Sequence, residues 1–334
     1  MNDFRAAVIG SGGFARDIAA HLPKSKELLL VGAYDADVEV AQGFVRDYGG
    51  RAYGSFEELL GDDSLDGVLI VTPNDTHFEL IEMASRAGKH VFVEKPITND
   101  IRQAKAAIKV AADAGVTLFV GHVARRSASA RMAKGIVDAG ALGTLVLIEG
   151  HIAHNGGLRL TADMWRWYRD RCPGGPMMQL AVHTVDTFNY LLGPVRSVTA
   201  MSGRRATPAE IDDVGVIALE YESGVLGYIG TAYTVPSSNF MNIYGTEALL
   251  QCDRTSADFI MRYKDDRVET RSAGSDVDPI AEELDDFARS ARQHSRPETG
   301  GEEGLQALAV ILAAIRSSEE GRKVTIEEML ADSP

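Results

Sequence analysis

Residues 72–96 read TPNDTHFELIEMASRAGKHVFVEKP, and this stretch decides the fold. An apolar run at residues 68–71 precedes it, and its first half is predicted to form a helix that ends at Gly88. A second apolar strand is predicted at residues 90–93, directly before Glu94 and Lys95. Strand, helix and strand in this order predict a parallel βαβ unit. Lys95 is therefore expected at the carboxyl edge of a parallel sheet, where open α/β sheets bind their ligands.

Length and composition limit the function classes. The chain has 334 residues, which predicts two domains, and its 45% hydrophobic and 25% charged residues are typical of globular proteins. A net charge of −14 argues against nucleic-acid binding. Neither a signal peptide nor an apolar run long enough for a membrane span is apparent. The two cysteines lack metal-ligand spacing, so reduced thiols in a cytoplasmic protein are expected, and no metal site is predicted.

The glycine-rich turn near the N-terminus predicts dinucleotide binding. Residues 5–9 are predicted to form a strand, and residues 10–15, GSGGFA, match the pattern GxGxxA before a predicted helix. Gly10 permits a tight turn, Gly12 lets the backbone approach a pyrophosphate, and Ala15 packs helix on strand. Gly13 and Phe14 lie in the same turn and are included among the expected cofactor contacts. A glycine-rich turn without any ligand is the alternative.

Asp35 bears on the choice of cofactor. It ends the second predicted strand, 20 residues after Ala15, where an acid is expected to accept hydrogen bonds from the adenosine ribose. A carboxylate at this position favours NAD, because it repels the 2′-phosphate of NADP. Arg16 and Arg46 stay as candidate partners for that phosphate, so NADP remains the alternative.

The order of predicted elements divides the chain into two domains. Strands and helices alternate through residue 121, which predicts an N-terminal Rossmann domain with a parallel sheet at residues 1–121. Residues 122–334 begin a different pattern, with several strands at roughly ten-residue spacing between helices. The fold class is therefore α/β, with a C-terminal α+β domain that holds a large mixed, mostly antiparallel sheet for substrate binding and oligomerisation.

Three motifs together resemble one known family. They are GxGxxA, the TPNxxH…EKP stretch, and residues 174–186, GGPMMQLAVHTVD. With them, the whole chain is similar to the glucose-fructose oxidoreductase/inositol dehydrogenase (Gfo/Idh/MocA) family. The resemblance implies an NAD(P)-dependent oxidoreductase of sugars, sugar derivatives or inositols. It also implies a C-terminal domain whose open sheet builds homodimers or homotetramers.

Two titratable residues are the candidates for proton transfer. Oxidation of a secondary alcohol needs a hydride acceptor and a base for the hydroxyl proton. Lys95, placed near the nicotinamide by the resemblance, is the first candidate, with a solvated lysine as the alternative. His183 is the second, and the alternative is a buried structural histidine. Asp186 is expected to orient the helix or His183. Gln179, one helical turn before His183, stands where many relatives have aspartate.

This departure leaves the mechanism open. Glutamine can hydrogen-bond but cannot take a proton. Either Lys95 and His183 suffice while Gln179 holds a substrate hydroxyl, or the protein has lost the chemistry.

The remaining candidates follow from the resemblance and from position. The turn at Thr72, Pro73 and Asn74, together with His77 and Glu94, is expected on the cofactor side, with helix capping by Asn74 or Asp75 as the alternative. The candidate substrate contacts are Arg125, Trp165, Arg166 and His122, with weaker support for His151, His154 and Tyr168. His151 and His154 do not share a strand face, so we expect at most one of them to point into the site.

The sequence thus predicts hydride transfer between a nicotinamide and a ring secondary alcohol or ketone. Two rivals stay open. One is the reduction of another cyclic carbonyl or diol. The other is a nucleotide-binding sensor or partner subunit without catalysis, and Gln179 is the residue that suggests it.

Overall fold

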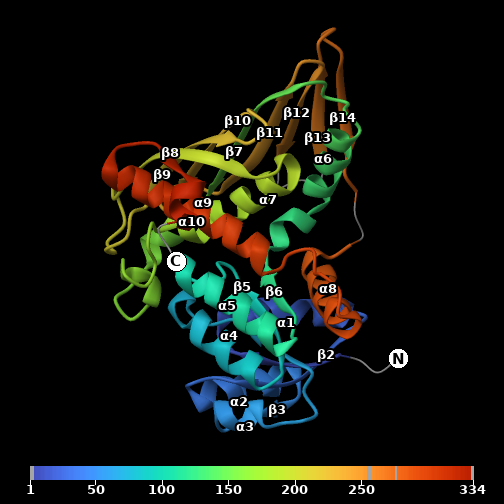
Figure 1. Ribbon diagram of the computed structural model, residues 1–334, viewed down its shortest axis with the longest axis vertical. Coiled ribbons are helices and arrows are strands. Elements are labelled where there is room, and N and C mark those ends of the chain that lie inside the picture. Colours follow the sequence, from blue (N-terminus) through green and yellow to red (C-terminus); the bar gives the residue numbers. More distant parts are fainter. Residues whose placement is uncertain (1–3, 254–257, 275–276, 332–334) are drawn as a thin grey trace. The chain divides into compact units, whose positions relative to one another are not determined.

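The computed structural model describes residues 4–253, 258–274 and 277–331, which form two compact units (Figure 1). The first unit contains the described residues up to Val123 together with Val277–Leu305. The second contains the described residues from Ala124 to Gly274 and from Gln306 onward. The chain therefore returns to the first unit after most of the second has been built.

A six-stranded parallel sheet forms the centre of the first unit, in the order β3-β2-β1-β4-β5-β6. This is the strand order of a doubly wound Rossmann fold, as predicted. The strands are β1 Phe4–Ile9, β2 Leu28–Tyr34, β3 Arg51–Ala52, β4 Gly67–Ile70, β5 His90–Glu94 and β6 Leu118–Gly121. The α-helices are α1 Gly13–His21, α2 Val38–Tyr48, α3 Phe56–Leu60, α4 His77–Arg86, α5 Ile101–Ala114 and α8 Pro279–Gln293.

The register of this sheet brings five strand ends to one edge. Ile9 pairs with both Tyr34 and Ile70, and Val93 pairs with Ile70 and Val120. Because all the strands are parallel, the residues that follow each of these positions lie along the carboxyl edge. Residues from five different parts of the sequence therefore meet in one row.

The sequence prediction did not place helix α8 in the first unit, to which it belongs. The sequence prediction assigned everything after residue 121 to the second domain. In the structure, Phe287 of α8 packs edge-on against Phe4 at 5.1 Å and against Phe92 and Phe119 at 5.9 Å. These rings are buried in one core cluster with Leu284 and Ala288. Sequence order alone could not place α8 there, because this packing involves residues distant in the chain.

A nine-stranded mixed sheet forms the second unit, in the order β14-β13-β12-β11-β7-β10-β9-β8-β15. Among the described strands of this sheet, only β10 and β7 pair in parallel. The strands are β7 Leu145–Ala153, β8 Val195–Gly203, β9 Val214–Tyr221, β10 Leu226–Ala232, β11 Ser238–Gly245, β12 Ala248–Asp253, β13 Asp258–Tyr263, β14 Val268–Ser272 and β15 Val324–Thr325. This confirms the predicted mixed, mostly antiparallel sheet.

One face of the nine-stranded sheet is covered by helices and the other is open. The helices are α6 Ala128–Asp138, α7 Val182–Leu192, α9 Gly301–Glu320 and α10 Ile326–Ala331, and Figure 1 shows α7 and α9 against the sheet. A side chain at Gly150 of β7 would collide with Phe188 of α7. On the opposite face the apolar side chains Met201, Val216, Leu226 and Tyr228 are exposed.

Several elements of the structure differ from the predicted ones. The sequence did not indicate the two-residue strands β3 and β15, the outer strands β13 and β14, or α10. The predicted helix at residues 177–192 begins with a π-helical turn, Met177–Ala181, before α7. Such turns often occur at functional sites. Within the part of the chain that the structure describes, no helix has the length and apolar character needed to span a membrane.

Candidate active site

The glycine-rich turn connects β1 to α1 at the point where the strand order reverses. Gly10 has a positive φ of 84°, and a Cβ there would lie 2.6 Å from the Thr72 side chain. Only glycine fits this turn without strain. Ideal Cβ atoms at Gly12 and Gly13 would meet nothing within 4 Å, so these two residues border open space. Ala15 is buried, whereas Phe14 is exposed.

Asp35 is held in place by the turn it faces. One carboxylate oxygen accepts from the Ser11 backbone N–H at 2.8 Å and from the Ser11 hydroxyl at 3.3 Å. The other oxygen accepts from the Asp37 N–H at 3.1 Å. Ser11 was missed by the sequence prediction, because the x position of GxGxxA carries no residue preference. Its hydrogen bonds connect Asp35, which is expected to bind the ribose, to the turn that is expected to bind the pyrophosphate.

Asn74 lies buried in the turn between β4 and α4. It begins a short 3-10 turn, Asn74–Thr76, and no side-chain capping bond is present at this turn or at the start of α4. The Asn74 side chain is only 4% exposed, and among the described residues its amide nitrogen has no hydrogen-bond partner. An unsatisfied buried amide is costly, so this donor is available to a ligand or to water.

His77 joins the two loops that flank the strand end. Its Nδ1 lies 2.9 Å from the Pro96 carbonyl oxygen, and its Nε2 lies 3.1 Å from the Thr72 carbonyl oxygen. Burial lowers the pKa of His77 despite these contacts. The neutral ring carries one N–H, so it donates to one carbonyl at a time. His77 is fully buried and thus positions the Thr72 and Pro96 loops from inside the unit.

Lys95 and Glu94 lie at the carboxyl end of β5. The Lys95 side chain is half-buried, and the Lys95–Pro96 peptide is cis. The Glu94 carboxylate accepts from the Lys95 backbone N–H at 3.1 Å. Burial raises the pKa of Glu94 to about 7, and the charge of Lys95 opposes this shift. Gly121 on the neighbouring strand leaves room for the carboxyl group, since a Cβ there would lie 2.8 Å from Glu94 Oε1.

These residues fit a bound dinucleotide. The N-terminus of α1 has no side-chain cap, so its backbone N–H groups are available to a pyrophosphate. The open space at Gly12 and Gly13 suits the pyrophosphate in the middle of such a ligand, and the buried amide of Asn74 offers a donor to another part of it. The fit rests entirely on groups of the first unit.

The second unit carries the other candidate residues except His122, which belongs to the first unit. His183 is half-buried near the start of α7, and Gln179 is buried in the preceding π-helical turn. Arg166 Nε donates to Gln179 Oε1 at 3.2 Å, and its guanidinium lies 4.4 Å from the centre of the Trp165 ring. The predicted Trp165–Arg166 pair and Gln179 are thus brought together.

Arg125 and Asp186 form a buried ion pair. Arg125 Nε donates to Asp186 Oδ2 at 2.9 Å, its second nitrogen reaches Oδ1, and both side chains are almost inaccessible. Its guanidinium also lies 5.2 Å from the centre of the Tyr190 ring. Asp186 holds α7 to the segment before α6, as its expected structural role required. Arg125 was predicted as a substrate contact, but the structure engages its guanidinium with Asp186 away from solvent.

The candidate histidines and Tyr168 are spread over different environments. His122 is fully buried, which does not suit its predicted contact with a substrate. His151 stacks on Phe240 with ring centres 5.7 Å apart, whereas His154 lies beyond β7 and stacks on Tyr233 at 4.9 Å. Tyr168 donates its hydroxyl proton to the Ala162 carbonyl.

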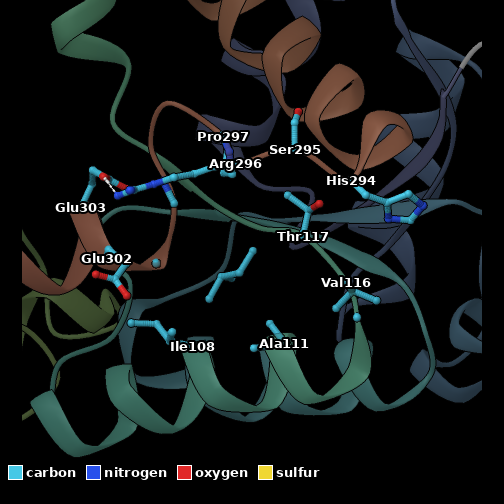
Figure 2. Close-up of a pocket in the computed structure, with 15 residues that line it drawn as sticks. Ile108, Ala111, Val116, Thr117, His294, Ser295, Arg296, Pro297, Glu302 and Glu303 are labelled. Carbon is cyan, nitrogen blue, oxygen red and sulfur yellow. Dashed lines mark hydrogen bonds and ion pairs between the residues drawn. The ribbon is translucent and has the colours of Figure 1, made fainter.

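A surface pocket of the first unit lies away from all these residues. Figure 2 shows it between α5 and the segment that follows α8, with Thr117, His294 and the Arg296–Glu303 ion pair on its wall. Thr117 directly precedes β6, so the pocket lies at the amino edge of the sheet. None of the predicted site residues lines it, and ligands of open α/β sheets bind at the opposite edge.

Comparison with known proteins agrees with this geometry. Residues 4–122 match the family model described as "Oxidoreductase family, NAD-binding Rossmann fold", and residues 130–251 match the "GFO/IDH/MocA C-terminal domain". The chain belongs to the Gfo/Idh/MocA family. It is an NAD-binding oxidoreductase with the N-terminal Rossmann domain that the family model describes.

Relatives with known names cover nearly the same length as this Gfo/Idh/MocA protein. D-xylose 1-dehydrogenase (NADP(+)) 2 from Haloferax volcanii is 30% identical, over 83% of this chain and 85% of the relative. 1,5-Anhydro-D-fructose reductase from Ensifer adhaerens is 26% identical, over 97% of this chain and 98% of the relative. A solved structure of an NADPH-dependent oxidoreductase from Desulfitobacterium hafniense is 33% identical, with a TM-score of 0.93 over 99% of both chains.

The pKa of Glu94 predicts how stability depends on pH. The folded value of about 7 exceeds the ordinary 4.5, so the folded state binds more protons between these values. Stability from this group is therefore full below pH 4.5 and falls as the pH rises to 7. The loss is about 3.5 kcal/mol at most, since one pKa unit corresponds to about 1.4 kcal/mol.

Urea unfolding of the cofactor-free protein at pH 5 and pH 8 measures this loss. Glu94→Gln is expected to lose less stability than the wild type between the two values. Glu57→Gln, at an exposed position on α3, is the control and should follow the wild type. Equal pH dependence in the wild type and Glu94→Gln would contradict the prediction.

Proposed function

We propose that the protein transfers a hydride between a nicotinamide cofactor and a ring secondary alcohol or ketone of a sugar, sugar derivative or inositol. The observation that carries the proposal is that Lys95 follows β5 at the carboxyl edge, next to the Thr72 loop that His77 holds and on the same edge as the glycine-rich turn. The nicotinamide supplies the hydride acceptor or donor when it is bound. The names of the relatives support a sugar-type substrate, because they act on D-xylose and 1,5-anhydro-D-fructose.

In this proposal Lys95 handles the proton at the reacting oxygen. Its amine accepts the hydroxyl proton during oxidation and returns it during reduction. The buried Glu94 carboxyl and the His77-bridged loops limit the directions that the lysine can take. Preorganisation of this kind lowers the cost of reaching the reactive geometry.

His183 is proposed as the second proton-transfer group, and Gln179 as an orienting residue. Gln179 already accepts from Arg166, so its carbonyl oxygen is fixed in direction. A carboxamide in this position cannot share the proton. The proposal therefore assigns proton transfer to Lys95 and His183, without Gln179.

We further propose NAD as the preferred cofactor. Asp35 is fixed by Ser11 and Asp37, so its carboxylate stays where a ribose 2′-phosphate would lie. Arg16, a candidate partner for that phosphate, instead pairs with Asp47.

Replacing Asp35 should change the cofactor preference. The wild type is expected to bind NAD more tightly than NADP, and Asp35→Ser should narrow this ratio at least about tenfold, or about 1.4 kcal/mol. Removal of the repelling carboxylate is the physical reason. Titration with both nucleotides, followed by protein fluorescence, gives the ratio. Asp17→Ser, at an exposed position on α1, is the control. An unchanged ratio in Asp35→Ser would refute the assignment.

Lys95→Ala tests the catalytic proposal. The variant is expected to lose about 10²–10⁴-fold in kcat, which is the usual contribution of a general acid–base group, while it still binds NAD. The assay follows reduced nicotinamide with a panel of sugars, sugar acids and inositols, and the reverse assay uses keto-sugars. Lys109→Ala on α5, an exposed lysine paired with Asp113, is the control. An undiminished kcat in Lys95→Ala would remove Lys95 from the mechanism.

A sensor or partner subunit is the second candidate, and Gln179 favours it. Such a protein would bind NAD without hydride transfer to any carbohydrate or cyclic ketone. Lys95/His183 double substitution would then leave its ligand binding unchanged. Reduction of another cyclic carbonyl or diol is the rival within catalysis, and the reverse assay distinguishes it. For either candidate we propose a cytoplasmic location, for which the two free, buried cysteines Cys172 and Cys252 give support.

We propose that a second copy of the chain covers the open face of the nine-stranded sheet. Met201 pairs with Val216 across β8 and β9, and Tyr228 on β10 pairs with Ala218. Met201 is 73% exposed, and Val216, Leu226 and Tyr228 are exposed beside it. Exposed apolar side chains that gather on adjacent strands are typical of protein interfaces. A homodimer or homotetramer follows from this proposal.

Charged residues on this face should separate the subunits. Val216→Asp/Tyr228→Asp is expected to sediment as a monomer at micromolar concentration, because a dimer would bury unpaired carboxylates. Analytical ultracentrifugation of the wild type should show a dimer or tetramer. Val38→Asp, at an exposed position on α2 of the first unit, is the control. A monomeric wild type would contradict the proposal.

A further inference from the structure

Arg166 is a cation whose partners in the second unit are neutral. Its Nε donates to the Gln179 carboxamide, and its guanidinium stacks on Trp165. Among residues 4–253, 258–274 and 277–331, no carboxylate forms an ion pair with it. Its side chain is exposed, so the remaining guanidinium N–H groups can reach a ligand.

Several other arginines of the second unit have carboxylate partners. Arg125 pairs with Asp186, and Arg169, three residues after Arg166, pairs with Asp212 at 3.4 Å. The nearby Asp163 accepts a hydrogen bond from Thr161. The positive charge of Arg166 is thus uncompensated in a protein with a net charge of −14.

The charge of Arg159 adds to that of Arg166, and both act on the ring of His154. Burial lowers the pKa of His154, and the charges of Arg159 and Arg166 lower it further. His154 Nδ1 accepts from the Gly156 N–H at 2.9 Å, so the neutral ring carries its proton on Nε2. The surroundings of Arg166 therefore offer hydrogen-bond donors and positive charge together.

The residue at position 179 decides whether this charge is available. An aspartate there could accept from Arg166 and would also neutralise it. Glutamine keeps the hydrogen bond and leaves the charge in place. The stack on Trp165 holds the guanidinium in a fixed plane, which suits bidentate binding of two oxygens of one anionic group.

We propose that Arg166, left uncompensated by Gln179, binds an anionic group of the substrate, so that the enzyme prefers acidic sugar derivatives to neutral sugars. The anionic group is a carboxylate or a phosphate, both of which match the guanidinium fork. This inference rests on the proposed oxidoreductase function and specifies its substrate class. Arg166 acts as a specificity residue and takes no part in proton transfer.

The experiment compares matched substrates that differ in charge. Glucose is compared with glucuronate and glucose 6-phosphate, and galactose is compared with galacturonate, each with saturating NAD. In the wild type, an acidic member of a set is expected to have a kcat/KM at least about tenfold above that of the neutral member, the effect of one charged hydrogen bond. The acid and phosphate members separate the two anion chemistries.

Two variants test the residues directly. Arg166→Gln should lower kcat/KM for the preferred acidic substrate at least about tenfold more than it lowers kcat/KM for the neutral sugar. Gln179→Asp should also reduce the acidic preference, and this reduction should vanish in the Arg166→Gln background. Arg169→Gln, whose guanidinium is paired with Asp212, is the matched control and should keep the wild-type preference.

A binding measurement separates failure of this inference from failure of the proposed function. With NADH bound, glucuronate, galacturonate or glucose 6-phosphate should raise the melting temperature of the wild type more than the neutral sugars do. Arg166→Gln should remove that difference, even if none of these sugars is turned over. The inference would be overturned if the wild type and Arg166→Gln had the same ratio of kcat/KM for acidic and neutral sugars. It would also be overturned if no acidic sugar raised the melting temperature of the wild type more than the neutral sugars do.

Discussion

The parallel register of the first sheet is the constraint on which the cofactor side of the site depends. Because β1, β2, β4, β5 and β6 are aligned, the residues after their ends form one row. Gly10, Asp35, Thr72 and Lys95 come from four separate loops and share this edge. A slip in any strand pairing would move its loop residue out of the row, so the backbone hydrogen bonds of the sheet set the spacing of the site.

Buried polar contacts then fix the loops that the sheet only brings near. Ser11 holds the Asp35 carboxylate, and His77 lies between the carbonyl groups of Thr72 and Pro96. In the second unit, Arg125 and Asp186 connect α7 to the segment before α6. Each of these contacts is costly to break, because a buried polar group left without its partner loses the hydrogen bonds that water would have given. The loops are therefore rigid where the proposed chemistry requires fixed directions.

Gln179, at a position where the family resemblance leads us to expect an aspartate, has two consequences. It removes a group that could share a proton, which raised the question of whether the protein is a catalyst. It also leaves Arg166 without a compensating charge in the second unit. Both effects have one physical origin, since a carboxamide resembles a carboxylate in shape but differs from it in charge and in its inability to accept a proton. Gln179 thus bears both on the proposed selectivity for anionic substrates and on the possible loss of catalysis.

The sequence alone determined the Rossmann domain, the mixed sheet and the family, because these depend on local patterns: strand–turn–helix order, the glycine turn and the EKP motif. Only the tertiary structure decided which distant residues meet. It placed α8 against the phenylalanine core of the first unit, paired Arg125 with Asp186 instead of leaving it for a substrate, and buried His122. It also revealed the contacts of Ser11 and Arg166, whose partners are 24 and 13 residues away. Burial and pairing across such separations depend on packing, and no local sequence pattern encodes them.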